Sequence, residues 1–277
     1  MSAAAQAANS AEGGAARGGA LMRVSGVEMR FGGIVALDGV SFDVGHREIC
    51  GLIGPNGSGK TTMFNCISGF YRYTVGDIVF DGTSIKDLAR HRMVELGIGR
   101  TFQNVALFRS MTVRQNMMVG HHYRGTSGFL SNALRLPRAR ADGREAARQA
   151  DELIELLELG AQANLPVGGL PFGWQKRVEL GRAMIAAPKL LLLDEPAAGL
   201  NHGEVDELGA LIKRLRSHFS LSILLVEHHM SLVMQVSDRV VALEFGRKIA
   251  DGTPEEVQRD PEVIRAYLGE GEEAAHV

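Results

Sequence analysis

The chain has 277 residues, of which 45% are hydrophobic and 22% are charged, and its 30 basic and 32 acidic residues give a formal net charge of −2. These values are ordinary for a globular protein that buries a sizeable core, and they exclude a general electrostatic attraction to nucleic acid or anionic lipid. No apolar run approaches the roughly 20 residues that a membrane-spanning helix needs. We therefore expect any role at a membrane to depend on partner subunits.

The two ends of the chain differ in character from the part between them. Residues 1–20 are rich in Ala, Gly and Ser and lack the apolar core of a signal peptide, so we expect a disordered tail. Residues 21–270 carry the folded domain in this interpretation, and 271–277 form a short C-terminal tail. The first folded segment, 24–44, has the pattern of short antiparallel strands separated by glycine turns.

A glycine-rich loop follows this segment. The apolar run Ile49–Ile53 predicts a buried strand, and Lys60–Ile67 predicts a helix. Between them, residues 54–61 match the pattern G-x-x-x-x-G-K-[ST]. Glycines at these positions let successive backbone N–H groups point inward at a helix N-terminus, which makes a phosphate-binding site. A glycine-rich turn with a chance lysine is the alternative, and the position between a strand and a helix disfavours it.

The loop predicts ATP and Mg²⁺ as ligands. Lys60 is placed to contact the β and γ phosphates of a nucleotide, and the Thr61 hydroxyl is placed to coordinate Mg²⁺. Cys50 and Cys66 flank the loop without metal-ligand spacing, so we expect reduced, buried thiols there.

Further along the chain, a second apolar run ends in two carboxylates. Residues 190–193, and later 223–226, are continuous aliphatic runs typical of parallel strands covered on both faces. Asp194 would then lie at the C-terminal end of a strand, where open α/β sheets bind ligands, and would hold the Mg²⁺ shell. Glu195 is placed to act as general base toward the attacking water. A solvated turn is the alternative for such a pair, and the upstream loop makes it the weaker one.

Helical periodicity lies between these runs, in residues 146–159 and 205–215. The segment between Gly120 and Asp142 is rich in Arg, Ser and Gly, and we interpret it as an insertion. Strands that alternate with helices predict a doubly wound α/β core.

Together these segments resemble the ATP-binding cassette (ABC) ATPases, and most closely the G-type ATP-binding subunit of branched-chain amino acid importers. The resemblance implies an α/β fold: a P-loop NTPase core with an N-terminal antiparallel β subdomain and a helical subdomain that, with the insertion, spans about 104–175. The segments that carry the resemblance are 30–33, 54–62, 65–71, 100–103, 194–201, 226–228 and 264–270.

The resemblance also implies roles for individual side chains. Phe31 corresponds to the aromatic residue that stacks on adenine, with a core phenylalanine as the alternative. Gln103 corresponds to the glutamine that senses Mg²⁺ and the attacking water, and His228 to the histidine that contacts the γ-phosphate. Catalysis would thus involve Glu195, His228, Gln103 and Lys60, and metal binding Thr61, Gln103 and Asp194. ATP would be held by Phe31, Gly54, Pro55, Asn56, Gly57, Ser58, Gly59, Lys60, Thr61, Thr62 and Gly173.

One motif departs from the family pattern. The signature segment, ideally Leu-Ser-Gly-Gly-Gln, is replaced here by residues 170–174, Leu-Pro-Phe-Gly-Trp, followed by Gln175. Gly173 and a helix expected to begin near Trp174 would keep the backbone part of a phosphate-binding helix N-terminus, but the serine hydroxyl is lost. In this family each ATP lies between the loop of one subunit and the signature segment of the other. We therefore expect one of the two sites to hydrolyse ATP slowly.

The resemblance implies an assembly at the cytoplasmic face of the membrane. Its expected members are a second ABC ATPase subunit in a heterodimer, two membrane permease subunits and an extracytoplasmic solute-binding protein, with no nucleic acid. The ATPase of a lipid or lipopolysaccharide exporter is an alternative, disfavoured by the insertion after Gly120. A soluble cassette protein acting on ribosomes or DNA is a further alternative, and the chain lacks the second cassette or long coiled-coil insertion usual there.

Overall fold

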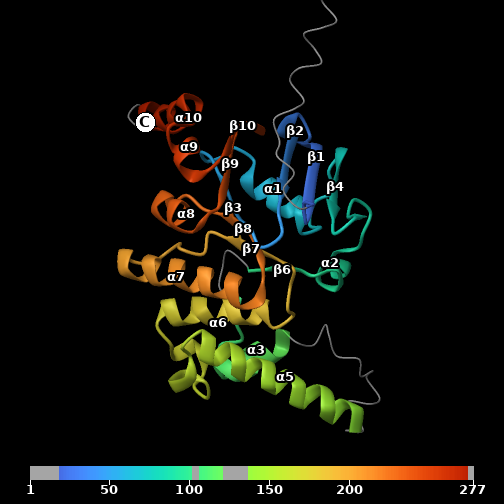
Figure 1. Cartoon of the computed structure of the whole chain (residues 1–277), viewed down its shortest axis with the longest axis vertical. Helices are drawn as coiled ribbons and strands as arrows, with labels where there is room; N and C mark the ends of the chain where they lie inside the picture. The colour runs from blue at the N-terminus through green and yellow to red at the C-terminus, as the bar shows by residue number, and fades with distance from the viewer. Residues whose placement is uncertain (1–18, 102–105, 121–136, 274–277) are drawn as a thin grey trace, which may run out of the picture.

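The computed structural model of the chain describes residues 19–101, 106–120 and 137–273, and it describes the side chains of these residues except 137–142 and 269–273. The fold is α/β, with a mixed central sheet, a smaller antiparallel sheet and helices around them. In Figure 1 the antiparallel sheet lies at the upper right, and a group of helices forms the lower part of the molecule. The fold class predicted from the sequence is confirmed.

Six strands make the central sheet, in the order β10-β9-β3-β8-β7-β6. All neighbouring pairs from β9 to β6 are parallel, and β10 pairs antiparallel with β9. The strands are β3 (Ile49–Ile53), β6 (Ile98–Arg100), β7 (Leu190–Asp194), β8 (Ser222–Val226), β9 (Arg239–Glu244) and β10 (Arg247–Gly252).

The central sheet is covered on both faces. Leu191 and Leu193 pack into one apolar cluster, whereas Leu190 and Leu192, which alternate with them, pack into another. Every residue of β3, β7 and β8 is buried, because neither face meets solvent. This explains why the three strands read as unbroken apolar runs in the sequence.

The smaller sheet has the order β2-β1-β4-β5 and is antiparallel throughout. Its strands are β1 (Met22–Phe31), β2 (Ile34–Val44), β4 (Val75–Phe80) and β5 (Thr83–Ser84), and α2 (Arg90–Leu96) follows them. The expected antiparallel strands in 24–44 are therefore present, as one long hairpin.

The helices form two groups. Around the central sheet lie α1 (Lys60–Ile67), α7 (His202–Phe219), α8 (Met230–Val236), α9 (Pro254–Gln258) and α10 (Pro261–Glu273). The lower group in Figure 1 consists of α3 (Val113–Gly120), α5 (Pro137–Leu156) and α6 (Phe172–Met184), with short 3-10 turns η2 (Gly160–Gln162) and η3 (Val167–Gly169). Among the described residues, no helix combines the length and apolarity needed to cross a membrane.

The helix boundaries differ from those predicted. The apolar period in 146–159 runs past the end of α5, because Leu157 and Leu159 are buried although Glu158 turns to a φ of 59° and ends the helix. Helix α7 is longer than 205–215, since it begins with a capping box that Asn201 forms with Glu204. The helix expected near Trp174 begins two residues earlier, at Phe172, with Pro171 as its N-cap.

Candidate functional site

Three neighbouring strands end at the same edge of the central sheet. Strands β3, β8 and β7 are adjacent and parallel, and Val226 of β8 is in register with both Leu52 of β3 and Asp194 of β7. The glycine-rich loop leaves β3, His228 follows β8, and Glu195 follows β7. Parallel strands bind ligands at their C-terminal edge, so the fold gathers the predicted site residues where such a site is expected.

The glycine-rich loop needs glycine at two of its positions. Gly54 has a φ of 147°, and a Cβ atom there would lie 2.1 Å from the backbone oxygen of Leu243. Gly59 has a φ of 104°, and a Cβ atom there would lie 2.7 Å from the backbone oxygen of Ala36. The backbone therefore packs tightly against β2 and β9 while it curls toward the start of α1. Gly57, in contrast, is exposed and open on its outer side.

Lys60 occupies the concave side of this loop. Its Nζ atom donates hydrogen bonds to the backbone oxygens of Gly54 at 2.6 Å and Pro55 at 2.8 Å, and the residue is 8% exposed. The ammonium group thus lies among the backbone atoms of the loop itself. The oxygens of a triphosphate are stronger acceptors than these neutral carbonyls, so the cradle fits the phosphates of ATP as a substrate.

Asp194 is the most buried acidic group of the predicted site. It is 3% exposed, and its Oδ2 atom accepts a hydrogen bond from Nη2 of Arg100 at 3.2 Å. Burial raises the pKa of the Asp194 carboxyl, and the Arg100 guanidinium acts in the opposite direction. This carboxylate and the Thr61 hydroxyl at the start of α1 are hard oxygen donors of the type that Mg²⁺ prefers. The donor chemistry therefore fits the magnesium ion that the sequence predicts.

Glu195 and His228 face one another across the strand edge. The Nδ1 atom of His228 lies 3.9 Å from Oε1 of Glu195, and the two side chains are 52% and 24% exposed. Glu195 has a φ of 47°, which is unusual for a residue with a side chain, and its N–H donates to the backbone oxygen of Val226 at 2.8 Å. Strained backbone of this kind is common at functional sites. Here the turn at Glu195 directs the carboxylate toward the end of β8.

Of two further residues predicted for the site, Phe31 and Gln103, the structure describes only Phe31. Phe31 is 42% exposed and meets Tyr71 edge to face, with ring centroids 5.2 Å apart. The alternative that Phe31 is a core residue is therefore wrong. Gln103 lies outside the described residues. The chain leads to it from Thr101, whose N–H donates to the backbone oxygen of Leu192 at 3.0 Å, beside the strand that carries Asp194.

Comparison with known proteins agrees with this geometry. The family model described as "ABC transporter" matches residues 37–198, and the model "Branched-chain amino acid ATP-binding cassette transporter" matches 247–273. The chain belongs to the ABC transporter ATPase family. It is 46% identical over 250 residues to the high-affinity branched-chain amino acid transport ATP-binding protein BraF of Pseudomonas aeruginosa, covering 90% of this chain and 98% of BraF.

Other relatives and a solved structure support the same family. The high-affinity branched-chain amino acid transport ATP-binding protein LivG of Escherichia coli is 45% identical over 250 residues, covering 90% of this chain and 98% of LivG. The crystal structure of the ADP conformation of an ATP-binding cassette of an ABC transporter matches with a TM-score of 0.79 and 30% identity, covering 90% of this chain and 99% of the other. As an ABC ATPase, the chain binds and hydrolyses ATP.

The signature segment of this ABC ATPase is built on the start of α6. Pro171 is the N-cap residue and makes no side-chain capping hydrogen bond. Trp174 packs against the apolar core, and the Arg177 guanidinium lies 5.0 Å from its ring. Phe172 remains 44% exposed. The first turn of α6 therefore offers backbone N–H groups from Phe172 onward, but no hydroxyl.

Glu227 is a site residue that sequence reasoning missed. It is fully buried, and its carboxylate accepts hydrogen bonds from three backbone N–H groups: Ala197 at 2.7 Å, His228 at 3.1 Å and His229 at 3.2 Å. It thereby ties the loop that carries Glu195 to the loop that carries His228. The available signal was an acidic residue directly after an apolar strand, the same signal that identified Asp194.

We expect Glu227→Gln to lower both stability and ATP turnover. The amide has one acceptor where the carboxylate has two, so its NH₂ group must face a backbone N–H. Each hydrogen bond to a charged group is worth about 1.5–3 kcal/mol, so the free energy of unfolding should fall by about that amount. Thermal melting and phosphate release check this. Glu256→Gln is the matched control, because Glu256 also accepts a backbone N–H, from Thr253, but lies in the capping box of α9. Equal behaviour of the two variants would contradict the assigned role.

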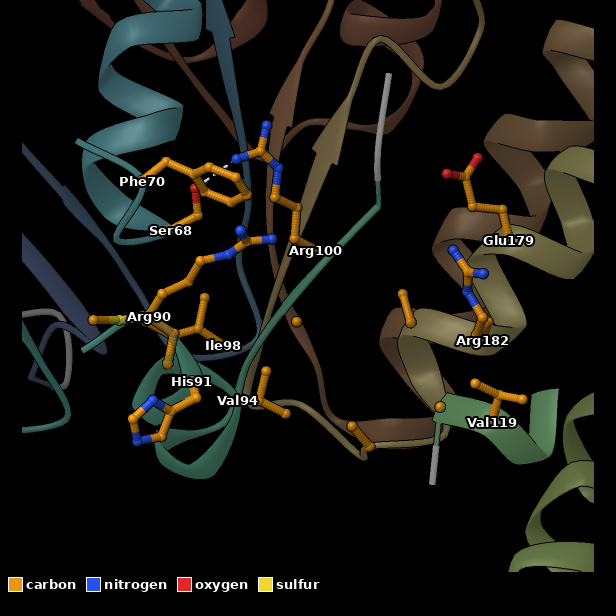
Figure 2. Close-up of a pocket in the computed structure, with 15 residues that line it drawn as sticks. Ser68, Phe70, Arg90, His91, Val94, Ile98, Arg100, Val119, Glu179 and Arg182 are labelled. Carbon is orange, nitrogen blue, oxygen red and sulfur yellow. Dashed lines mark hydrogen bonds between the residues drawn. The ribbon is translucent and has the colours of Figure 1, made fainter. Parts of the chain in front are cut away.

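A groove lies beside the site, between the core and the helical region. It has a volume of ≈ 670 Å³ and extends between α2 and β6 on one side and α3 and α6 on the other (Figure 2). The Phe70 ring lies between two guanidinium groups, with Arg90 at 3.6 Å and Arg100 at 4.7 Å from its centroid. Arg182 reaches in from α6, near Glu179. Since Arg100 also bonds Asp194, one side chain links this groove to the nucleotide site.

Proposed function

We propose that this ABC ATPase hydrolyses ATP to energise uptake of branched-chain or related amino acids. The observation that carries the proposal is the match of residues 247–273 to the branched-chain amino acid family model, beyond the segment common to ABC transporters. The relatives with 45–46% identity are described as branched-chain amino acid transport proteins and extend over the whole folded part of this chain.

In the proposed mechanism the loop amides and Lys60 hold the β and γ phosphates of the substrate, and Phe31 stacks on adenine. Asp194, Thr61 and Gln103 would hold Mg²⁺, which would supply neutralisation of the phosphate charge. Glu195 accepts the proton of the attacking water as the bond to the γ-phosphorus forms and ADP leaves.

The remaining side chains have positioning roles. His228 lies 3.9 Å from Glu195 and is placed to donate to the γ-phosphate, while Glu227 fixes the backbone of both loops. Gly173 and the first turn of α6 would contact the ATP held by the second ATPase subunit. Pro55, Asn56 and Ser58 of the loop, together with Thr62 of α1, complete the phosphate cradle.

We further propose that the chain is bound at the cytoplasmic face of the membrane through two permease subunits. Its expected partners also include a second ABC ATPase subunit in a heterodimer and an extracytoplasmic solute-binding protein. The groove beside the site suits a permease segment that carries a carboxylate, because Arg90, Arg100 and Arg182 give it an excess of positive charge. Movement of such a segment would act on Asp194 through Arg100.

A lipopolysaccharide export ATPase, LptB of Haemophilus influenzae, is also similar to this chain. It is 37% identical over 231 residues, covering 83% of this chain and 90% of LptB. The lower identity and shorter match, together with the family model matched at 247–273, favour amino-acid uptake.

Solute-dependent ATP hydrolysis tests the proposal. We expect the complex of this chain with its ATPase and membrane partners, supplied with the solute-binding protein, to release phosphate several-fold faster when leucine, isoleucine or valine is added. Lysine and glutamate serve as controls and should give no increase. Stimulation by lipopolysaccharide in place of the amino acids would contradict the proposal and favour export.

A further inference from the structure

The C-terminal helix α10 reaches the nucleotide-binding loop through one side chain. The Tyr267 hydroxyl accepts a hydrogen bond from the backbone N–H of Gly54 at 2.9 Å, across a separation of 213 residues. Gly54 is the first residue of the loop and follows Ile53, the last residue of β3. The two residues belong to different family segments, since Gly54 lies in 37–198 and Tyr267 in 247–273.

Both backbone polar groups of Gly54 have hydrogen-bond partners. Its N–H donates to Tyr267, and its carbonyl oxygen accepts from Nζ of Lys60 at 2.6 Å. Its φ of 147° and the close approach of Leu243 leave it no room for a side chain. The hydrogen bond that Gly54 donates to Tyr267 does not involve Lys60, so a triphosphate that binds the Lys60 ammonium would leave it intact.

The Tyr267 ring also packs against an apolar cluster at the end of β3. This cluster contains Ile53 at the end of β3 and Val263 of α10, and Met230, the first residue of α8, packs against it. Met230 comes two residues after His228. Helix α10 therefore shares one apolar cluster with the strand that precedes the phosphate loop and with the helix that follows His228.

We propose that Tyr267 is a positioning residue through which the C-terminal segment sets the nucleotide affinity of the loop. Its hydroxyl holds Gly54, and thereby the oxygens that surround Lys60, in the geometry that receives the phosphates. The tyrosine does not contact the reacting atoms, so its role lies in binding ATP and leaves the chemical step to Glu195. The proposal goes beyond amino-acid transport, because it concerns nucleotide binding by the chain whatever solute the complex moves.

Tyr267→Phe tests the proposal, because it removes the hydroxyl and keeps the ring in the apolar cluster. Loss of one hydrogen bond should weaken binding of a fluorescent ATP analogue by about 3- to 10-fold. In steady-state hydrolysis by the assembled complex, KM for ATP should rise by a similar factor, while kcat should change less than about 2-fold.

Tyr73→Phe is the matched control. The Tyr73 hydroxyl also accepts a backbone N–H, from Ile78 at 3.0 Å, but it lies in the antiparallel subdomain. Both variants should lose similar thermal stability, and only Tyr267→Phe should lose nucleotide affinity. Unchanged affinity in Tyr267→Phe, an equal loss in both variants, or a fall in kcat alone would overturn the proposal.

Hydrogen exchange of the wild-type chain gives a second test that needs no variant. Coupling between two sites is reciprocal, so ATP binding should slow amide exchange in residues 261–268. Residues 75–80 of β4 provide the comparison and should not respond. Exchange in 261–268 that is unaffected by saturating ATP would overturn the proposal.

Discussion

Glu195→Gln should slow ATP hydrolysis at this chain's own site by about 10²–10⁴-fold, the usual contribution of a general base. Glutamine matches the size of glutamate but cannot take the proton from the attacking water. Asp194 and Lys60 remain in place, so the variant should still bind ATP. The backbone fixes where the Glu195 carboxylate lies, because Glu195 has a φ of 47° and its Oε1 atom lies 3.9 Å from Nδ1 of His228.

Phosphate release by the assembled complex measures this loss, and size-exclusion chromatography with Mg-ATP should show an ATP-trapped dimer of the ATPase subunits. Glu152→Gln is a suitable control, since Glu152 is a half-exposed residue of α5 that pairs with Arg148 and His218. Wild-type turnover in Glu195→Gln would mean that another group activates the water.

In the proposed heterodimer, the two ATP sites should contribute unequally to hydrolysis. The Lys60 loop of this chain would face an intact signature segment on the partner, whereas the partner's loop would face residues 170–174 of this chain. Pro171 has neither a hydroxyl nor a backbone N–H to donate to a γ-phosphate. A hydrogen bond to a charged group is worth about 1.5–3 kcal/mol, so the second site should be slower by roughly 10- to 150-fold.

In this prediction the asymmetry arises from the hydrogen-bond donor that is missing at Pro171, and Trp174 packs against the apolar core. The test is to replace the loop lysine of each subunit separately in the assembled transporter. Lys60→Ala should abolish nearly all turnover, and the equivalent change in the partner should have a milder effect. Equal losses, the reverse order, or full activity of a homodimer of this chain would contradict the prediction.

The parts of the fold that sequence predicted well are those specified by local chemistry. The strand Ile49–Ile53, the glycine loop and the helix Lys60–Ile67 follow one another without a gap, so each confirms the next. Asp194 could be predicted because a buried strand leads directly to it. Helix ends were less predictable, because buried residues such as Leu157 and Leu159 continue the apolar pattern after the backbone has left the helix.

Contacts between distant segments could not be read from the sequence. Glu227 is recognisable as a positioning residue only when β7 and β8 are known to be neighbours, which brings Ala197 within reach of its carboxylate. Arg100 bonds Asp194 because β6 pairs with β7. Tyr267 meets Gly54 only in the folded chain. In each case the residue type is common in proteins, and only the tertiary structure shows which distant group the side chain contacts.

ATP-driven uptake into proteoliposomes tests most directly whether hydrolysis at this chain's site powers transport. The measurement is accumulation of labelled leucine by vesicles that hold the complete transporter and receive the solute-binding protein, with ATP on the side of this chain. Wild-type vesicles should accumulate leucine against its gradient. Vesicles with Glu195→Gln should bind ATP equally well and accumulate leucine at least about 10-fold more slowly, because only the slower site of the partner remains. Uptake that proceeds at the wild-type rate with Glu195→Gln, or that does not require ATP, would contradict the account.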